Sequence, residues 1–324
     1  MAALLEIKEL RVYFDTEDGV VKAVDGVSFY VEPGETLGIV GESGCGKSVT
    51  CHSILQLHPS NGRIVTGSIV FEQVDLLSLD WSSLDSYRGS EIAMIFQDPV
   101  GALNPVHTIG SQIVESLTLH RGMGKDEARS EALRLLEIVG MADAEQRLRE
   151  YAHQLSGGMS QRAMIAMALA CHPKLLIADE PTTALDVTIQ AQILELMRQL
   201  QREYGMSIIL ITHDLGVIAE MANRVLVMYS GKVVEETSVD NLFQRPAHPY
   251  TIGLLNSLPR IDCDLDRLAL IEGSVPPPFE LPEGCYFAPR CRFATDECGR
   301  GVPPLKSVRP GQEVACLHPQ GLTS

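Results

Sequence analysis

Apolar and polar side chains alternate in the first part of the chain, up to about residue 70. Residues 27–32 alternate regularly, and residues 64–71 are rich in β-branched side chains around Gly67. A period of two residues places every second side chain on the same face of a sheet. We therefore expect several half-buried strands here, in an antiparallel sheet.

Continuous apolar runs follow at residues 36–40, 92–96, 175–178 and 208–211. Runs of this kind are typical of strands that are buried on both faces, as in a parallel sheet. Residues 128–139 and 189–200 repeat apolar side chains at the helical period instead, and the first of these helices should end at Gly140. The pattern predicts an α/β core with parallel strands.

Composition narrows the class of protein. The 324 residues are 45% hydrophobic, enough for a substantial core, and the net charge of −16 argues against a nucleic acid partner held by a general basic surface. No run reaches the roughly eighteen apolar residues that a membrane-spanning helix needs. The first residues also lack the pattern of a signal peptide. We expect a globular chain that resides in the cytosol.

The composition changes after about Asn241. Twelve of the eighteen prolines and five of the eight cysteines lie in the last 84 residues, with three consecutive prolines at 276–278. Such a segment is typical of loops. We expect one domain over residues 1–240 and a loop-rich extension over residues 241–324.

One motif combines a strand, a glycine-rich loop and a helix, which is the context that gives the pattern its chemical meaning. Glycines let backbone N–H groups point at phosphate oxygens, and the lysine adds a positive charge near the β and γ phosphates. The serine that follows can bind Mg²⁺. The alternative is a glycine-rich turn with an incidental lysine. The residues are Gly41, Glu42, Ser43, Gly44, Cys45, Gly46, Lys47 and Ser48.

Two acidic residues end the apolar run at 175–178. Asp179 is placed to hold Mg²⁺, often through water, and Glu180 could polarise an attacking water as a general base does. Taken alone, this segment fits a buried strand that ends in solvated acids better than it fits a catalytic site.

A further motif, residues 155–161 (LSGGMSQ), resembles the signature loop of ATP-binding cassette (ABC) proteins. Met159 and Ser160 depart from the commonest family form, Gly-Gln. With the motifs above, the resemblance to ABC ATPases covers residues 4–240. It implies the P-loop NTPase fold, with an antiparallel β subdomain first and a helical subdomain at about residues 99–165.

The resemblance implies roles for several residues. Gln97 would sense Mg²⁺ and the attacking water, and residues 98–105 would help to couple the ATPase to membrane partners. Residues 184–186, including Asp186, would cross a dimer interface, and His213 would contact the γ-phosphate. The family stacks adenine on an aromatic side chain, for which Tyr13 and Phe14 are candidates; the spacing after Leu10 favours Phe14.

In that family, the two nucleotide-binding loops of one chain cannot close on the same nucleotide. ATP on residues 41–48 of one subunit would be covered by Ser156, Gly157 and Gly158 of another subunit. Mg²⁺ would be held by Ser48, Gln97 and Asp179, and hydrolysis would use Glu180, His213 and Gln97. The resemblance therefore predicts a nucleotide-sandwich dimer that closes on ATP and reopens after hydrolysis.

The tail resembles a particular branch of ABC ATPases. Residues 245–251 (RPAHPYT) resemble the His-Pro-Tyr element that opens the C-terminal extension of dipeptide and oligopeptide importer ATPases, some of which handle nickel or other solutes. This implies a peripheral ATPase at the cytoplasmic face of the bacterial inner membrane. Its implied partners are a homologous ATPase, two transmembrane permease subunits and an external solute-binding protein. Nucleic acid is not an expected partner.

Two alternatives remain at this point. One is a soluble ABC ATPase of DNA maintenance or translation, which the single cassette and the acidic charge disfavour. The other is an iron–sulfur sensor that binds nucleotide without using it for transport. The transported solute cannot be identified from this chain, because specificity belongs to other subunits.

Four cysteines of the extension, Cys285, Cys291, Cys298 and Cys316, could hold a metal in a segment with little core of its own. Their spacing allows a [4Fe–4S] cluster, tetrahedral zinc or free thiols, and the absence of Cys-x-x-Cys weakens ordinary zinc. Resemblance to dipeptide importer ATPases, some of which carry a [4Fe–4S] cluster, favours iron–sulfur. The other cysteines, Cys45, Cys51, Cys171 and Cys263, lack such clustering.

Overall fold

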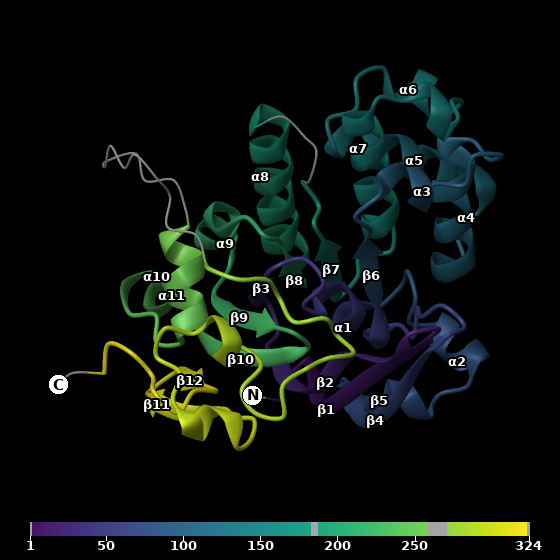
Figure 1. Ribbon diagram of the computed structural model, residues 1–324. Coiled ribbons are helices and arrows are strands. Elements are labelled where there is room, and N and C mark those ends of the chain that lie inside the picture. The colour runs from purple at the N-terminus through teal and green to yellow at the C-terminus, as the bar shows by residue number, and fades with distance from the viewer. Residues whose placement is uncertain (1, 183–186, 258–270, 323–324) are drawn as a thin grey trace. The chain divides into compact units, whose positions relative to one another are not determined.

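The structure is a computed structural model that describes residues 2–182, 187–257 and 271–322 (Figure 1). The chain divides into two compact units. The first comprises Met1–Ala2, Glu32–Glu35 and Ser78–Ile211, and the second comprises Ala3–Val31, Thr36–Leu77 and Thr212–Ser324. Each unit therefore draws on segments that lie far apart in the sequence.

The second unit begins with a four-stranded sheet in the order β2-β1-β4-β5. Its strands pair antiparallel, and one face carries a buried row that includes Leu5, Ile7 and Val12. The antiparallel sheet predicted from the alternating pattern is confirmed. The strands are β1 (Leu5–Thr16), β2 (Gly19–Val31), β4 (Gly62–Phe71) and β5 (Val74–Asp75).

A second group of strands in this unit mixes parallel and antiparallel pairs. Parallel β3 and β9 are followed by antiparallel β10, β12 and β11, and Glu235 on β10 pairs with Val314 on β12. The extension thus continues the strand order of the cassette. The strands are β3 (Thr36–Val40), β9 (Arg224–Tyr229), β10 (Lys232–Ser238), β11 (Lys306–Arg309) and β12 (Gln312–Val314).

The helices of the second unit are α1 (Lys47–Ile54), α9 (Leu215–Met221), α10 (Val239–Gln244) and α11 (Pro249–Asn256). Helix α11 begins with Pro249, whose missing N–H costs nothing in the first turn. Short 3-10 turns cover Ala288–Arg290 and Asp296–Gly299. The extension is therefore loop-rich, as predicted, but it also contains regular elements.

The first unit contains three parallel strands, β6 (Ile92–Ile95), β7 (Leu175–Asp179) and β8 (Ser207–Ile211), and every residue in them is buried. Helix α8 (Val187–Tyr204) buries the apolar stripe that includes Ile193 and Leu200. These elements confirm the parallel strands and the second predicted helix.

Of the remaining helices of this unit, α3 to α7 lie together as a bundle in Figure 1, and α2 lies apart from them. Helix α5 ends at Ile138, and Gly140 has a φ of 71°, so the predicted stop is confirmed. The helices are α2 (Trp81–Asp85), α3 (Pro99–Ala102), α4 (Ile109–Arg121), α5 (Lys125–Ile138), α6 (Ala144–Arg147) and α7 (Gly157–Leu169). In the described part of the chain, no helix is both long and apolar enough to cross a membrane.

Candidate functional site

The loop between β3 and α1 depends on its glycines. Gly44 and Gly46 have φ angles of 78° and 99°, which other residues rarely adopt. A Cβ on Gly46 would also lie 2.3 Å from the carbonyl oxygen of Ala23, so the backbone packs too closely for a side chain. Helix α1 follows at Lys47. This is the strand, loop and helix arrangement that presents backbone N–H groups to phosphate.

Lys47 is folded back over this loop. Its Nζ donates hydrogen bonds to the carbonyl oxygens of Gly41 (2.8 Å) and Glu42 (3.0 Å), and the residue is 6% exposed. The neighbouring Cys45 thiol is buried too. Burial raises the pKa of Cys45, against the opposing effect of the Lys47 ammonium. In this conformation the Lys47 ammonium binds carbonyl oxygens of its own loop.

Glu42 is held by the C-terminal extension at both its backbone and its side chain. Its N–H donates to the Tyr250 hydroxyl (2.8 Å). The Arg290 guanidinium donates to both carboxylate oxygens, with Nη1 at 2.7 Å from Oε2 and Nη2 at 3.1 Å from Oε1. This paired contact raises the pKa of Arg290 further above its already high value. The second residue of the loop is thus firmly anchored.

In the other unit, two acidic residues stand at the end of β7, as predicted. Asp179 is 2% exposed, and Glu180 has a φ of 47°, a left-handed conformation that is unusual for a residue with a Cβ. Its N–H donates to the Ile211 carbonyl oxygen (2.9 Å). Gln97 donates from Nε2 to Oε2 of Glu180 (3.0 Å), so the structure brings these two predicted residues together.

Ser156, Gly157 and Gly158 lie at the start of α7. The hydroxyl of Ser156 accepts a hydrogen bond from the N–H of Met159 (3.4 Å) and caps the helix. Buried Gln161 donates to the Pro181 carbonyl oxygen (2.6 Å), and thereby ties α7 to the turn after Glu180. Ser156 and Gly157 themselves are exposed, at the N-terminal end of a 13-residue helix.

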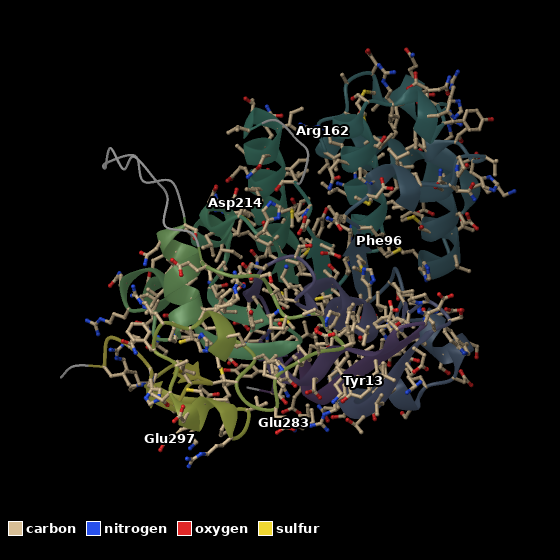
Figure 2. The ribbon with its side chains drawn as sticks, in the orientation of Figure 1. Tyr13, Phe96, Arg162, Asp214, Glu283 and Glu297 are labelled. Carbon is tan, nitrogen blue, oxygen red and sulfur yellow. The ribbon has the colours of Figure 1, made fainter. Side chains whose placement is uncertain are left out.

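Arg162, one turn further along α7, is held within the same unit (Figure 2). Its Nη2 donates to the Gln192 side chain on α8 (2.7 Å), and its Nη1 donates to the Val139 carbonyl oxygen at the end of α5. The helix that begins at the signature loop is therefore fixed to two neighbours.

Tyr13 and Phe14 point to opposite faces of β1, as neighbours in a strand do. The Tyr13 hydroxyl donates to Asp25 (3.0 Å), which also accepts from Tyr286 (3.1 Å). The Phe14 ring packs against the backbone at Gly62, where an added Cβ would lie 2.6 Å from it. Figure 2 labels Tyr13 on the β1 ribbon.

His213 lies in an exposed turn before α9. Asp214, labelled in Figure 2, caps that helix by accepting hydrogen bonds from the N–H groups of Gly216 (2.8 Å) and Val217 (3.4 Å). The predicted interface residues 184–186, with Asp186, lie outside the described residues. Cys263 also lies outside them.

The four clustered cysteines line one pocket of the extension together with His248 and His318. The His318 N–H donates to the Sγ of Cys316 (3.3 Å). Burial raises the pKa of Cys316 to about 11, so this thiol is neutral. Among the residues that the structure describes, no three Cys, His, Asp or Glu side chains form a metal-binding group. The predicted metal-binding extension is therefore not supported by the structure.

The His-Pro-Tyr element rests on a buried carboxylate. Glu235 accepts hydrogen bonds from the N–H groups of Ala247 (3.0 Å) and His248 (2.8 Å). The Nδ1 of His248 accepts from the N–H of Tyr250 (3.0 Å), and burial lowers the pKa of His248 to about 3. This neutral histidine fixes the start of α11 and with it the tyrosine that reaches Glu42.

The two residues that anchor Glu42, Tyr250 and Arg290, could not be identified from the sequence. Tyr250 belongs to the motif that assigned the branch, but the motif carries no sign that its hydroxyl reaches the loop. Arg290 lies in a proline-rich stretch without periodicity. A buried arginine can be found from sequence only when its partner is known, and Glu42 is 248 residues away.

Two family models match this chain. One, described as "ABC transporter", matches residues 24–183. The other, "Oligopeptide/dipeptide transporter, C-terminal region", matches residues 234–298. The strand, loop and helix at residues 36–54 and the carboxylates that end β7 lie within the first match. The chain belongs to the ABC transporter ATPases, which hydrolyse ATP in a manner coupled to transport.

Relatives that align over almost the whole chain narrow the assignment within this family. The chain is 55% identical to the oligopeptide transport ATP-binding protein AppD of Bacillus subtilis over 318 residues, 98% of this chain and 97% of that protein. It is 50% identical to the oligopeptide transport ATP-binding protein OppD of Salmonella typhimurium over 316 residues, 98% of this chain and 94% of that protein. The similarity covers both the cassette and the extension.

A solved structure shares the fold. It is described as the dimeric structure of MJ0796, a bacterial ABC transporter cassette, and it matches with a TM-score of 0.66 and 29% sequence identity. The match covers 72% of this chain and 98% of that chain. The predicted P-loop ABC fold is confirmed.

Proposed function

We propose that this chain is the ATP-hydrolysing motor subunit of an importer of dipeptides and oligopeptides, at the cytoplasmic face of the bacterial inner membrane. The observation that carries the proposal is that one chain matches both the ABC transporter model and the model of the oligopeptide/dipeptide transporter C-terminal region. The names of AppD and OppD support peptides over nickel as the solute. The expected partners are a homologous ATPase, two permease subunits and an external peptide-binding protein.

The phosphates of ATP would lie on residues 41–48. Lys47 would release the carbonyl oxygens of Gly41 and Glu42 and turn its charge to the β and γ phosphates. The N–H groups of the loop and the first turn of α1 would donate to the phosphate oxygens. The base would stack on Phe14, because the hydroxyl of its neighbour Tyr13 is bound to Asp25.

Ser48, Gln97 and Asp179 would hold Mg²⁺, for which their hydroxyl, amide and carboxylate oxygens are suitable ligands. The bound ion would neutralise charge that develops on the phosphates. Gln97 uses its amide nitrogen to bond Glu180, which leaves its amide oxygen as the atom for the metal. Glu180 would orient and polarise the attacking water, and His213 would contact the γ-phosphate.

The dimer is supported by Gly157. Its φ is not in the left-handed region, and an added Cβ would meet nothing within 4 Å, so the chain's own packing does not require glycine there. A bare backbone at a helix N-terminus suits close approach by a phosphate group. In the proposed dimer, Ser156, Gly157 and Gly158 would cover the ATP of the facing subunit, and Asp186 would lie at the interface.

The experiment is reconstitution in lipid vesicles with the two permease subunits, the partner ATPase and the binding protein. We expect ATP turnover to rise when the binding protein carries a peptide, and labelled peptide to accumulate inside the vesicles. Turnover that responds to nickel, DNA or ribosomes, and not to peptide, would refute the assignment. The Glu180→Gln protein serves as the control for ATPase contamination.

A [4Fe–4S] cluster on Cys285, Cys291, Cys298 and Cys316, or zinc in its place, is a separate proposal. It rests on the donor type of the four side chains, which line one pocket without forming a metal-binding group among the described residues, and no step above depends on it. The test is metal analysis and absorption spectroscopy of anaerobically purified protein. Iron and sulfide in a ratio of one, lost in a Cys298→Ser variant, would support the cluster. Zinc alone would refute the cluster and support zinc in its place, and no metal would refute both.

A further inference from the structure

The contacts on Glu42 suggest a role for the extension at the ATP site. Glu42 is the second residue of the phosphate loop, and it receives contacts at two separate groups. Its N–H donates to the Tyr250 hydroxyl on α11, and its carboxylate accepts two hydrogen bonds from Arg290. A planar guanidinium that meets both oxygens of a carboxylate fixes orientation as well as distance.

The anchor is rigid on the side of the extension. The Arg290 side chain is 5% exposed, and it also donates to the carbonyl oxygen of Glu272 (3.1 Å) and to the hydroxyl of Tyr229 (3.4 Å). Tyr229 and Tyr250 pack with ring centroids 4.8 Å apart, and Phe287 lies 5.3 Å and 5.4 Å from these two rings. The groups that hold Glu42 are therefore themselves held.

The anchored part of the loop also contacts Lys47, the residue that is expected to bind phosphate. Lys47 bonds the carbonyl oxygens of Gly41 and Glu42, the two residues at the anchored start of the loop. A glycine-rich loop has many accessible conformations, and ordering it on binding costs free energy. Fixing Glu42 before ATP arrives removes part of that cost.

We propose that Arg290 and Tyr250 are positioning residues for ATP: the extension holds the phosphate loop in its binding conformation through Glu42. This inference rests on the proposed assignment of residues 41–48 to the phosphates. It predicts that loss of the anchor weakens ATP binding while it leaves turnover at saturating ATP nearly unchanged, since the hydrolytic groups lie elsewhere.

The experiment measures the Kd for ATP of the full-length chain and the KM and kcat of the assembled transporter. Arg290→Gln should raise Kd and KM about tenfold, and Tyr250→Phe about threefold, with kcat within about twofold of wild type. Arg290→Lys keeps the charge but not the paired geometry, and should recover part of the affinity. Arg292→Gln is the matched control, because this exposed guanidinium lies over the Phe293 ring.

A double-mutant cycle separates this role from a general loss of structure. If Arg290 acts through Glu42, then Glu42→Gln and Arg290→Gln together should raise Kd no more than the larger single change. Multiplying effects would overturn the proposal, and so would an unchanged Kd in both Tyr250→Phe and Arg290→Lys. Tyr250→Phe, which removes a single hydroxyl, decides the matter if Arg290→Gln does not fold.

Lys47→Ala separates the positioning role of the extension from the phosphate-binding role of residues 41–48. If it abolishes ATP binding while the Arg290 and Tyr250 variants bind as wild type does, the phosphate assignment holds and the positioning role is wrong. If Lys47→Ala binds ATP normally, the proposed function of residues 41–48 is itself wrong.

Discussion

The two loops expected to contact ATP differ in how firmly their own unit holds them. The loop of residues 41–48 buries Cys45, Gly46 and Lys47 and is anchored at Glu42. The loop that starts α7 exposes Ser156 and Gly157. A Cβ would clash at 2.3 Å on Gly46, but would meet nothing within 4 Å on Gly157.

A glycine in a motif can therefore be required for either of two reasons. Gly46 is required by the backbone that surrounds it, so its absence would disturb the unliganded chain. Gly157 has no such requirement within its unit, so we look for the cause in a contact that forms only with another subunit. In the proposed site, the loop that would bind the phosphates is anchored before ATP arrives, whereas Ser156 and Gly157 would cover ATP only in a dimer.

The largest expected effect is a loss of ATP hydrolysis that leaves ATP binding intact. Glu180→Gln should lower turnover by about 100-fold to 10,000-fold, the range of general-base catalysis, while the Kd for ATP changes less than about twofold. Single-turnover hydrolysis and equilibrium nucleotide binding measure the two quantities. Glu137→Gln, at an exposed position on α5, is the control. Undiminished turnover in Glu180→Gln would remove Glu180 from the mechanism.

The comparison itself is tested by a pair of alanine substitutions. Gly46→Ala should weaken ATP binding by about 100-fold, because the backbone must move away from Ala23. Gly157→Ala should bind ATP normally yet lose turnover by about 100-fold, because closure over the nucleotide is blocked. Nucleotide binding, dimer formation on ATP and turnover are measured for both. Weakened ATP binding by the isolated Gly157→Ala chain would contradict the distinction.

A smaller effect is a loss of folding stability at low pH in the unit that contains Tyr250 and Arg290. The pKa of His248 is lowered to about 3 by burial, below its usual value of 6.5, so the unfolded chain binds a proton that the folded chain does not. Stability is then fully present above pH 6.5 and falls as the pH drops towards 3. From pH 7 to 5 we expect a loss of about 2 kcal/mol.

His248→Asn tests this expectation, because asparagine caps helices well but does not titrate. The urea midpoint of the variant should change less between pH 7 and 5 than the midpoint of the wild type. Equal changes in the two proteins would show that His248 is not responsible. Hydrogen exchange at the Tyr250 amide would place the effect at the anchor.

The smallest effect concerns the backbone of the other unit. Glu180 has a φ of 47°, which costs a residue with a Cβ roughly 1–2 kcal/mol, and glycine avoids that cost at the expense of chain entropy. Glu180→Gly should therefore raise the free energy of unfolding by about 0.5–1 kcal/mol relative to Glu180→Ala. Both variants lack the carboxylate, so their unfolding midpoints isolate the backbone. Equal midpoints would show that no strain is stored there.

Much of the fold could be predicted from local patterns. Residues 36–40 and 175–178 are apolar except for Thr36, and such runs indicate burial on both faces whatever the rest of the chain does. The helix end at Gly140 could be predicted because glycine readily adopts the positive φ of that position, which is 71° here. The acidic pair at the end of β7 was placed by the apolar run before it, and a shared site with Gln97 was expected only from the family resemblance, which did not predict the hydrogen bond between Gln97 and Glu180.

The features that could not be predicted depend on contacts between segments that lie far apart in the sequence. Nothing near Glu42 in the sequence indicates that a tyrosine and an arginine of the extension will bind it. Strands β11 and β12 are short, and they form because β10 offers them an edge. The spacing of the four cysteines allowed a [4Fe–4S] cluster, zinc or free thiols, because spacing cannot show whether thiols meet at ligand distances.

The position of Arg290 has a consequence for the order of events during synthesis. It stands 248 residues after Glu42, and the ion pair between them cannot form until the ribosome has added that length of chain. At about 5–20 residues per second, this takes roughly 12–50 s. For that interval the nascent cassette has its complete phosphate-loop sequence but not its anchor. A chain released early would therefore be a poor competitor for cellular ATP.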